Sequence, residues 1–155
     1  MAENIVVAGA IRHGLYVLRG TDGGLNDDGR KDVENVARQM IQFFPQELLR
    51  DTLLLCGEKR RVRDTAEIVQ SALGIVAVVM PILNVEGSRH APRESVLATI
   101  EPLLHGKRAV LIAGQDHMVD WLPGVLHEGG SGYTVLSYAE AMVITEDGVL
   151  HKLEP

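Results

Sequence analysis

The chain contains little cysteine, few aromatic residues and no long hydrophobic run. Of its 155 residues, one is a cysteine, Cys56, and 4% are aromatic. A single thiol excludes an intramolecular disulfide and is typical of proteins from a reducing compartment. With so few aromatic rings, the core must consist mainly of Val, Leu, Ile, Ala and Met side chains. No apolar stretch approaches the ~20 residues that a membrane span needs, so no membrane partner is expected.

An excess of positive charge is also missing. Lys and Arg total 15 against 21 Asp and Glu, so the net charge is −6. Non-specific binding to nucleic acid requires clustered basic side chains, and we therefore expect no nucleic-acid partner. The first residues include no basic region ahead of an apolar segment, so no signal peptide is predicted and the expected location is the cytoplasm.

Length and patterning predict one domain over residues 1–155. Hydrophobic residues make up 46% of the chain and charged residues 23%, as in ordinary globular proteins. A chain of this length buries a substantial core without metals or disulfides. No repeat or linker-like run divides it.

Short apolar runs alternate along the chain with longer segments of helical periodicity. Strands are expected at residues 15–18, 52–56, 75–80, 109–113, 141–144 and 149–153, with residues 5–7 as an extra edge strand. Helices are expected after Asn26, before Gly74, after Pro92 and around residues 118–126. Strands that alternate with helices indicate βαβ units. The predicted fold class is therefore α/β, a three-layer α/β/α arrangement around a mostly parallel, doubly wound sheet.

Basic groups, glycines and helix starts gather after the expected strands. They lie in residues 19–22, 57–61, 84–87 and 114–117. Ligands of such sheets bind outside the carboxyl ends of the strands, and this combination of groups suits an anion, phosphate above all. The basic run at residues 59–63 could also be a solvated helix start. Cations at a helix N-terminus are repelled by the helix dipole, however, and an anion bound between them would reduce this repulsion.

Four segments, in their order and spacing, resemble motifs of the histidine phosphatase superfamily. This superfamily has the phosphoglycerate-mutase-like fold, and the similarity is to its short phosphohistidine-phosphatase branch. In the family the first strand ends in Arg-His-Gly, a Ser-Pro-x-x-Arg-Ala-x-x-Thr-Ala segment follows the second strand, and a Gly-His or Ser-His pair ends a later strand. The matching segments here are residues 15–20, 22–30, 57–69 and 110–115, of which 57–69 matches best.

The resemblance implies a site with altered chemistry. In the family, the first His is the nucleophile, and a second His and two Arg stabilise the transferring phosphoryl group. With the first strand at residues 15–18, Arg19 and Arg61 take the places of the two arginines, Gly20 that of the nucleophile and Gln115 that of the second histidine. Glycine has no side chain, and glutamine donates a hydrogen bond without carrying charge.

The resulting expectation is a catalytically inactive histidine-phosphatase-like protein with a residual phosphate pocket and a regulatory or binding role. A phosphate or phosphorylated small molecule is the expected ligand, a protein partner is compatible with this role, and no cofactor or metal is expected. His117 lies two residues after Gln115, where it either reaches the pocket or is an exposed helix residue. The expected pocket residues are Arg19, Gly20, Arg61, Gln115 and His117.

A second possible position of the first strand predicts an active enzyme. A literal Arg12-His13-Gly14 precedes residue 15. If residues 5–11 formed the first strand, His13 would be the nucleophile, Arg12 its partner and Glu86 the candidate general acid of an active phosphomonoester or phosphohistidine phosphatase. We favour residues 15–18, because the small residues at 8–10 make a poor buried strand.

The remaining cysteine and histidines point to no other chemistry. A cysteine phosphatase loop would place Arg six residues after Cys56, where the chain has Val62, so Cys56 is expected to be a small buried apolar side chain. The other histidines show no spacing typical of metal ligands; they are His90, His105, His127 and His151.

Overall fold

The computed structural model describes residues 4–18, 22–84, 91–115 and 117–155. The strands are β1 (Val7–Arg12), β2 (Thr52–Cys56), β3 (Ala77–Val79), β4 (Ala109–Gly114), β5 (Ala141–Ile144) and β6 (Leu150–Leu153). The α-helices are α1 (Asp27–Met40), α2 (Gln46–Leu49), α3 (Arg60–Leu73), α4 (Arg93–Ile100) and α5 (Met118–Leu126). Short 3-10 helices cover Ile41–Phe43, Pro81–Leu83 and Glu101–Leu104.

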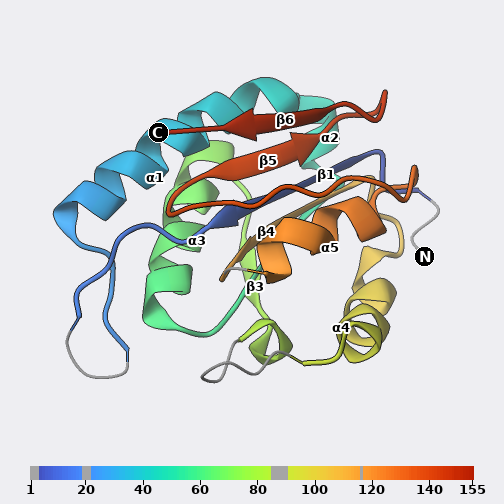
Figure 1. Cartoon of the computed structure of the whole chain (residues 1–155). Helices are drawn as coiled ribbons and strands as arrows, with labels where there is room; N and C mark the ends of the chain where they lie inside the picture. Colours follow the sequence, from blue (N-terminus) through green and yellow to red (C-terminus); the bar gives the residue numbers. More distant parts are fainter. Residues whose placement is uncertain (1–3, 19–21, 85–90, 116) are drawn as a thin grey trace.

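The strands form one six-stranded sheet in the order β3-β2-β4-β1-β5-β6 (Figure 1). The pairs β3–β2, β2–β4 and β4–β1 are parallel, whereas β5 and β6 add two antiparallel strands at one side. The predicted α/β class with a mostly parallel sheet is therefore confirmed.

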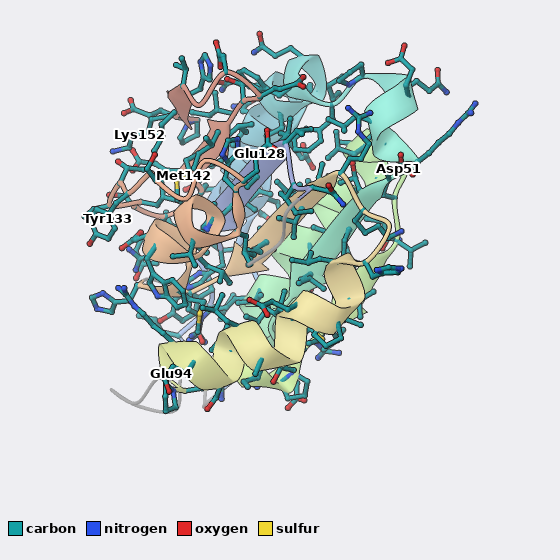
Figure 2. The ribbon with its side chains drawn as sticks, turned by 90° about the vertical axis from the view of Figure 1, so that its right-hand side faces the viewer. Asp51, Glu94, Glu128, Tyr133, Met142 and Lys152 are labelled. Carbon is teal, nitrogen blue, oxygen red and sulfur yellow. The ribbon has the colours of Figure 1, made fainter. Side chains whose placement is uncertain are left out.

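Helices cover both faces of the sheet, as the side chains of β4 show. Leu111 packs in the hydrophobic cluster that contains α1 and α3, whereas Val110 and Ile112 pack in the cluster that contains α4 and α5. Successive strand residues point to opposite faces, so this alternation places one pair of helices on each side. Figure 2 shows α4 and α5 from their own side of the molecule. None of the helices in the described residues has the length and hydropathy needed to cross a membrane.

The first strand is β1, and the prediction of a strand at residues 15–18 is wrong. β1 lies near the middle of the sheet, between β4 and β5, and so is not the edge strand expected at residues 5–7. Leu18 is 85% exposed, and Tyr16 forms only an isolated bridge with Leu25. The apolar run at residues 15–18 therefore lies outside the sheet, at the surface.

Small residues suit β1 because the neighbouring strands fill the space around it. A Cβ atom on Gly9 would lie 2.9 Å from both Leu111 Cδ1 and the Met142 carbonyl oxygen. Glycine here permits a close approach of large side chains from β4 and β5. Gly9, one of the small residues that seemed to disqualify this strand, is thus required by its neighbours.

Most other predicted elements are confirmed with adjusted ends. The strand expected at residues 75–80 is shorter, and the strand expected at 109–113 extends to Gly114. Asn26 caps α1 by accepting a 2.7 Å hydrogen bond from Gly29 N, and Gly74 ends α3 with a left-handed φ of 75°. The short helix α2 was not predicted.

The loop after β1 lies directly against the first turn of α1. A Cβ atom on Gly14 would lie 2.8 Å from the Gly29 carbonyl oxygen, and one on Gly29 would lie 2.1 Å from the Leu15 carbonyl oxygen. Both positions therefore need glycine for backbone contact. This contact fixes where the residues that follow β1 lie, including His13.

Candidate active site

His13 directly follows β1 at the carboxyl edge of the sheet. Its side chain is 3% exposed. Its backbone N–H donates to the Gly114 carbonyl at the end of β4 (3.0 Å), and its own carbonyl accepts from Ala139 N (3.1 Å). His13 is therefore held from both sides in the middle of the edge where ligands bind in sheets of this type.

The His13 imidazole is oriented by its neighbour. Its Nδ1 atom lies 2.9 Å from the Gly14 carbonyl oxygen. A carbonyl oxygen only accepts hydrogen bonds, so this contact places the proton of the neutral ring on Nδ1 and the lone pair on Nε2. An imidazole held in this tautomer has the electron pair that a nucleophile requires.

Two tyrosine rings flank the imidazole. The centre of the Tyr16 ring lies 5.4 Å from that of His13 in an edge-to-face arrangement, and the Tyr138 ring lies 5.5 Å away, tilted. The two tyrosine rings are 6.3 Å apart. These distances are those of favourable aromatic pairs, so the three rings form one cluster.

Each tyrosine in turn carries an arginine. The guanidinium carbon of Arg12 lies 4.4 Å from the centre of the Tyr138 ring, and that of Arg61 lies 4.4 Å from the centre of the Tyr16 ring. Arg12 also donates from Nη1 to the Leu136 carbonyl (3.1 Å). The structure therefore places Arg61 against Tyr16 and Arg12 against Tyr138, the two rings that flank His13.

The Nε atoms of both arginines are buried and have no hydrogen-bond partner. A buried N–H without a partner costs about 1–3 kcal/mol, and each such group in a folded protein needs an explanation. An oxyanion between the two guanidinium groups would supply acceptors with matching charge. This pair of unpartnered donors is the clearest sign of an anion site in the described residues.

Thr65 joins α3 to the His13 loop, and the sequence analysis did not give it a role. Its side chain is fully buried. Its Oγ1 donates to the Arg61 carbonyl (2.8 Å) and accepts from Gly14 N (3.3 Å). One hydroxyl therefore links the backbones that carry Arg61 and His13. The only available signal was its place in the segment that best matches the family.

Replacing Thr65 by valine is expected to destabilise the protein by about 1–3 kcal/mol, because it leaves the buried Gly14 N–H without an acceptor at almost unchanged side-chain volume. Urea unfolding followed by circular dichroism would measure this. Thr99→Val is the matched control, since the exposed Thr99 hydroxyl only donates to the carbonyl four residues earlier. Equal midpoints for the two variants would contradict the linking role of Thr65.

The basic start of α3 already has an anion from the chain itself. Asp22 Oδ1 accepts from Arg60 N (2.7 Å) at the first turn of the helix. Asp64, farther along α3, accepts from Leu25 N (3.0 Å) and pairs with Arg30 (3.5 Å). Carboxylate at a helix N-terminus is favourable, so Asp22 explains part of the basic run without any ligand. Arg61 remains the member of that run that faces the tyrosine cluster.

Gln115 follows β4 directly and is 5% exposed. Because Gly114 pairs with Arg12 in the parallel register of β1 and β4, Gln115 comes next to the position of His13. The structure thus brings Gln115 and His13 to the same edge of the sheet.

Of the remaining candidate residues, the structure describes only His117. Arg19, Gly20 and Glu86 lie outside the described residues. His117 is exposed and lines a cavity of about 220 Å³ together with Arg93, Trp121 and Tyr133. With β1 as the first strand, His13 takes the position directly after that strand, which the prediction of a strand at residues 15–18 had given to residues 19–20.

Cys56 is a buried core residue. Cys56 ends β2 and is 1% exposed, and burial raises the pKa of its thiol. The protonated thiol is a poor nucleophile at neutral pH, as expected of a small apolar core residue. The described residues contain no group of three or more His, Cys, Asp or Glu side chains that could hold a metal ion.

Comparison with known proteins finds similar structures over nearly the whole chain. The protein histidine phosphatase SixA, solved with tungstate, superposes with a TM-score of 0.72 at 19% identity and covers 96% of this chain and 97% of its own. The phosphohistidine phosphatase SixA of Agrobacterium tumefaciens superposes with a TM-score of 0.66 at 18% identity and covers 96% of this chain and 97% of its own. A mycobacterial glucosyl-3-phosphoglycerate phosphatase gives 0.58 at 12% identity over 96% of each chain.

No protein-family model and no curated sequence matches the chain. Identities of 12–19% establish a common fold, and the coverage shows that this fold includes both the sheet and the helices on its two faces. The chain therefore has the same fold as these phosphatases, the phosphoglycerate-mutase-like fold that the sequence analysis predicted.

Proposed function

We propose that this chain hydrolyses phosphomonoesters or phosphohistidine with His13 as the nucleophile. The observation that carries the proposal is the buried His13 ring at the end of β1, with Nδ1 directed to the Gly14 carbonyl and two arginines with unpartnered buried Nε atoms beside it. Phosphoryl transfer needs this combination of a nucleophile and fixed positive charge. The similar SixA structure contains tungstate, a tetrahedral oxyanion.

The proposed reaction has two steps. His13 Nε2 attacks phosphorus, an N–P bond forms, and the P–O bond to the leaving group breaks with its electron pair on the leaving oxygen. That oxygen takes a proton, for which we propose Glu86 from its position in the sequence. Water then attacks phosphorus and gives a proton to the Glu86 carboxylate, the N–P bond breaks with its electron pair on His13 Nε2, and inorganic phosphate and free His13 result. Arg12 and Arg61 stabilise the charge on the phosphoryl oxygens in both steps.

Gln115 favours a second candidate, a protein that binds phosphate or a phosphorylated small molecule without turnover. A glutamine amide donates one or two hydrogen bonds to an oxyanion, but it adds no positive charge. A charged donor makes a shorter and stronger bond to phosphate than a neutral one, so this site stabilises the transition state less than a site with two histidines. In this case the chain has a regulatory or binding role.

Turnover and binding measured on the same sample distinguish the two candidates. The purified chain is incubated with p-nitrophenyl phosphate, and its mass is measured after an alkaline quench, since phosphohistidine survives base. We expect release of nitrophenol, a mass gain of one phosphoryl group, and a higher melting temperature with tungstate. Tungstate stabilisation without turnover would favour the second candidate. Neither turnover nor stabilisation would contradict a phosphate site altogether.

A further inference from the structure

We infer that Tyr16 and Tyr138 are positioning residues that hold Arg61 and Arg12 beside His13 through cation–π contacts. The inference rests on the proposed phosphoryl site and adds to it the means by which its positive charge is held in place. It comes from the continuous row of contacts in the order Arg12, Tyr138, His13, Tyr16, Arg61.

Each tyrosine ring makes two contacts with the site at once. The centre of the ring lies 5.4 Å (Tyr16) or 5.5 Å (Tyr138) from the centre of the His13 imidazole. A guanidinium carbon lies 4.4 Å from the same ring centre. A movement of either ring would therefore displace an arginine relative to the nucleophile. Tyr138 lies outside the segments that resemble family motifs, and Tyr16, which lies within residues 15–20, has no role in the resemblance.

An aromatic partner leaves an arginine free to bind phosphate. A ring attracts the guanidinium through its face, whereas the N–H donors of the guanidinium lie in its plane and stay directed outward. A carboxylate would instead occupy these donors and cancel the charge. The ion pairs between described residues, Arg30–Asp64 and Lys152–Glu140, involve neither Arg12 nor Arg61.

The unpartnered Nε atoms follow from this arrangement. Arg12 Nε and Arg61 Nε are buried without an acceptor, and the rings that lie against the two guanidinium groups offer none. Gln115 is neutral, whereas Arg12 and Arg61 carry positive charge to the rings that flank His13. The rate and the affinity of the site should then depend on the rings that set the position of this charge.

The experiment replaces each ring while the arginines stay. Tyr16→Leu and Tyr138→Leu remove the aromatic face, and Tyr16→Phe and Tyr138→Phe keep it and remove only the hydroxyl. Tyr133→Leu is the matched control, because Tyr133 is 61% exposed and lies outside the row of contacts. Melting curves without ligand show that each variant is folded. Tyr138 is itself 39% exposed, so its replacement opens little of the core.

Tungstate affinity by calorimetry, together with kcat and KM for a phosphate ester, gives the readout. The leucine variants should bind tungstate about threefold to thirtyfold more weakly, the range that loss of one cation–π contact spans. Their kcat should fall more than their KM rises, because the arginines act most strongly on transition-state charge. The phenylalanine variants and Tyr133→Leu should stay within about twofold of the unchanged protein.

Three results would overturn the inference. A folded leucine variant that binds tungstate as well as the unchanged protein would show that the rings do not position the arginines. Tighter binding would show that the rings hold the arginines away from the anion. Phenylalanine variants as weak as the leucine ones would assign the effect to the hydroxyl groups. Failure of the unchanged protein to bind tungstate would instead contradict the proposed function.

Discussion

His13→Asn is expected to lower phosphate-ester turnover by more than about 10³-fold and to abolish the phosphorylated intermediate, the size of effect seen when a covalent nucleophile is removed. Asparagine keeps a donor near the position of Nδ1, so it can still bond to the Gly14 carbonyl, which the imidazole meets at 2.9 Å. It has no atom in place of Nε2. Steady-state kinetics and the mass after an alkaline quench measure the two effects.

The variant must remain folded for this result to count. His13 is buried between two tyrosine rings, so a melting curve with and without tungstate accompanies the kinetics. His105→Asn is the matched control, because His105 is exposed and precedes β4 at the opposite edge of the sheet. Turnover that survives in a folded His13→Asn variant would exclude His13 as the nucleophile.

Gln115→His is expected to raise kcat by about tenfold to a hundredfold, because one preorganised donor at a developing negative charge is worth about 10²–10³ in rate when it is removed from an enzyme. Gln115 follows Gly114, whose register partner Arg12 precedes His13, so an imidazole introduced here would lie on the same edge as the nucleophile. The gain should be largest at low pH, where the introduced ring is charged, and should fade as the pH rises past ~6.5.

The pH dependence separates a charge effect from a packing effect. A gain that is constant between pH 5 and 8 would show that the introduced ring acts by shape alone. Gln42→His serves as control, since Gln42 is exposed and donates to the Gln39 carbonyl (3.0 Å). An unchanged rate together with tighter tungstate binding would favour the second candidate, a phosphate-binding protein whose site lacks more than one charge.

Part of the site could be predicted from the sequence because it depends on short-range features. Residues 57–69 carry Arg61 and Thr65 at a fixed spacing on α3, and a helix determines which of its side chains share a face. Gln115 was expected at the end of a strand, and it is found there. Arg61 and Gln115 therefore lie on the helix and at the strand end expected for them, although the first strand is not the predicted one.

The tyrosine cluster could not be predicted in the same way. Tyr138 lies more than a hundred residues from Arg12 and His13, and no local pattern relates these positions. Their contact arises because the chain returns to β1 through β5, the antiparallel neighbour of the first strand. The same is true of the hydrogen bond from Ala139 N to the His13 carbonyl (3.1 Å).

By itself, the sequence determined the α/β class, the alternation of strands and helices, the Asn26 cap and the Gly74 end of α3, because periodicity and capping act between residues a few positions apart. Only the tertiary structure decided which of two candidate segments is the first strand. Residues 15–18 have the better strand composition, but Gly9 fits between Leu111 and Met142, where a larger residue would clash. That choice depends on side chains about a hundred positions away, and it places His13 at the site.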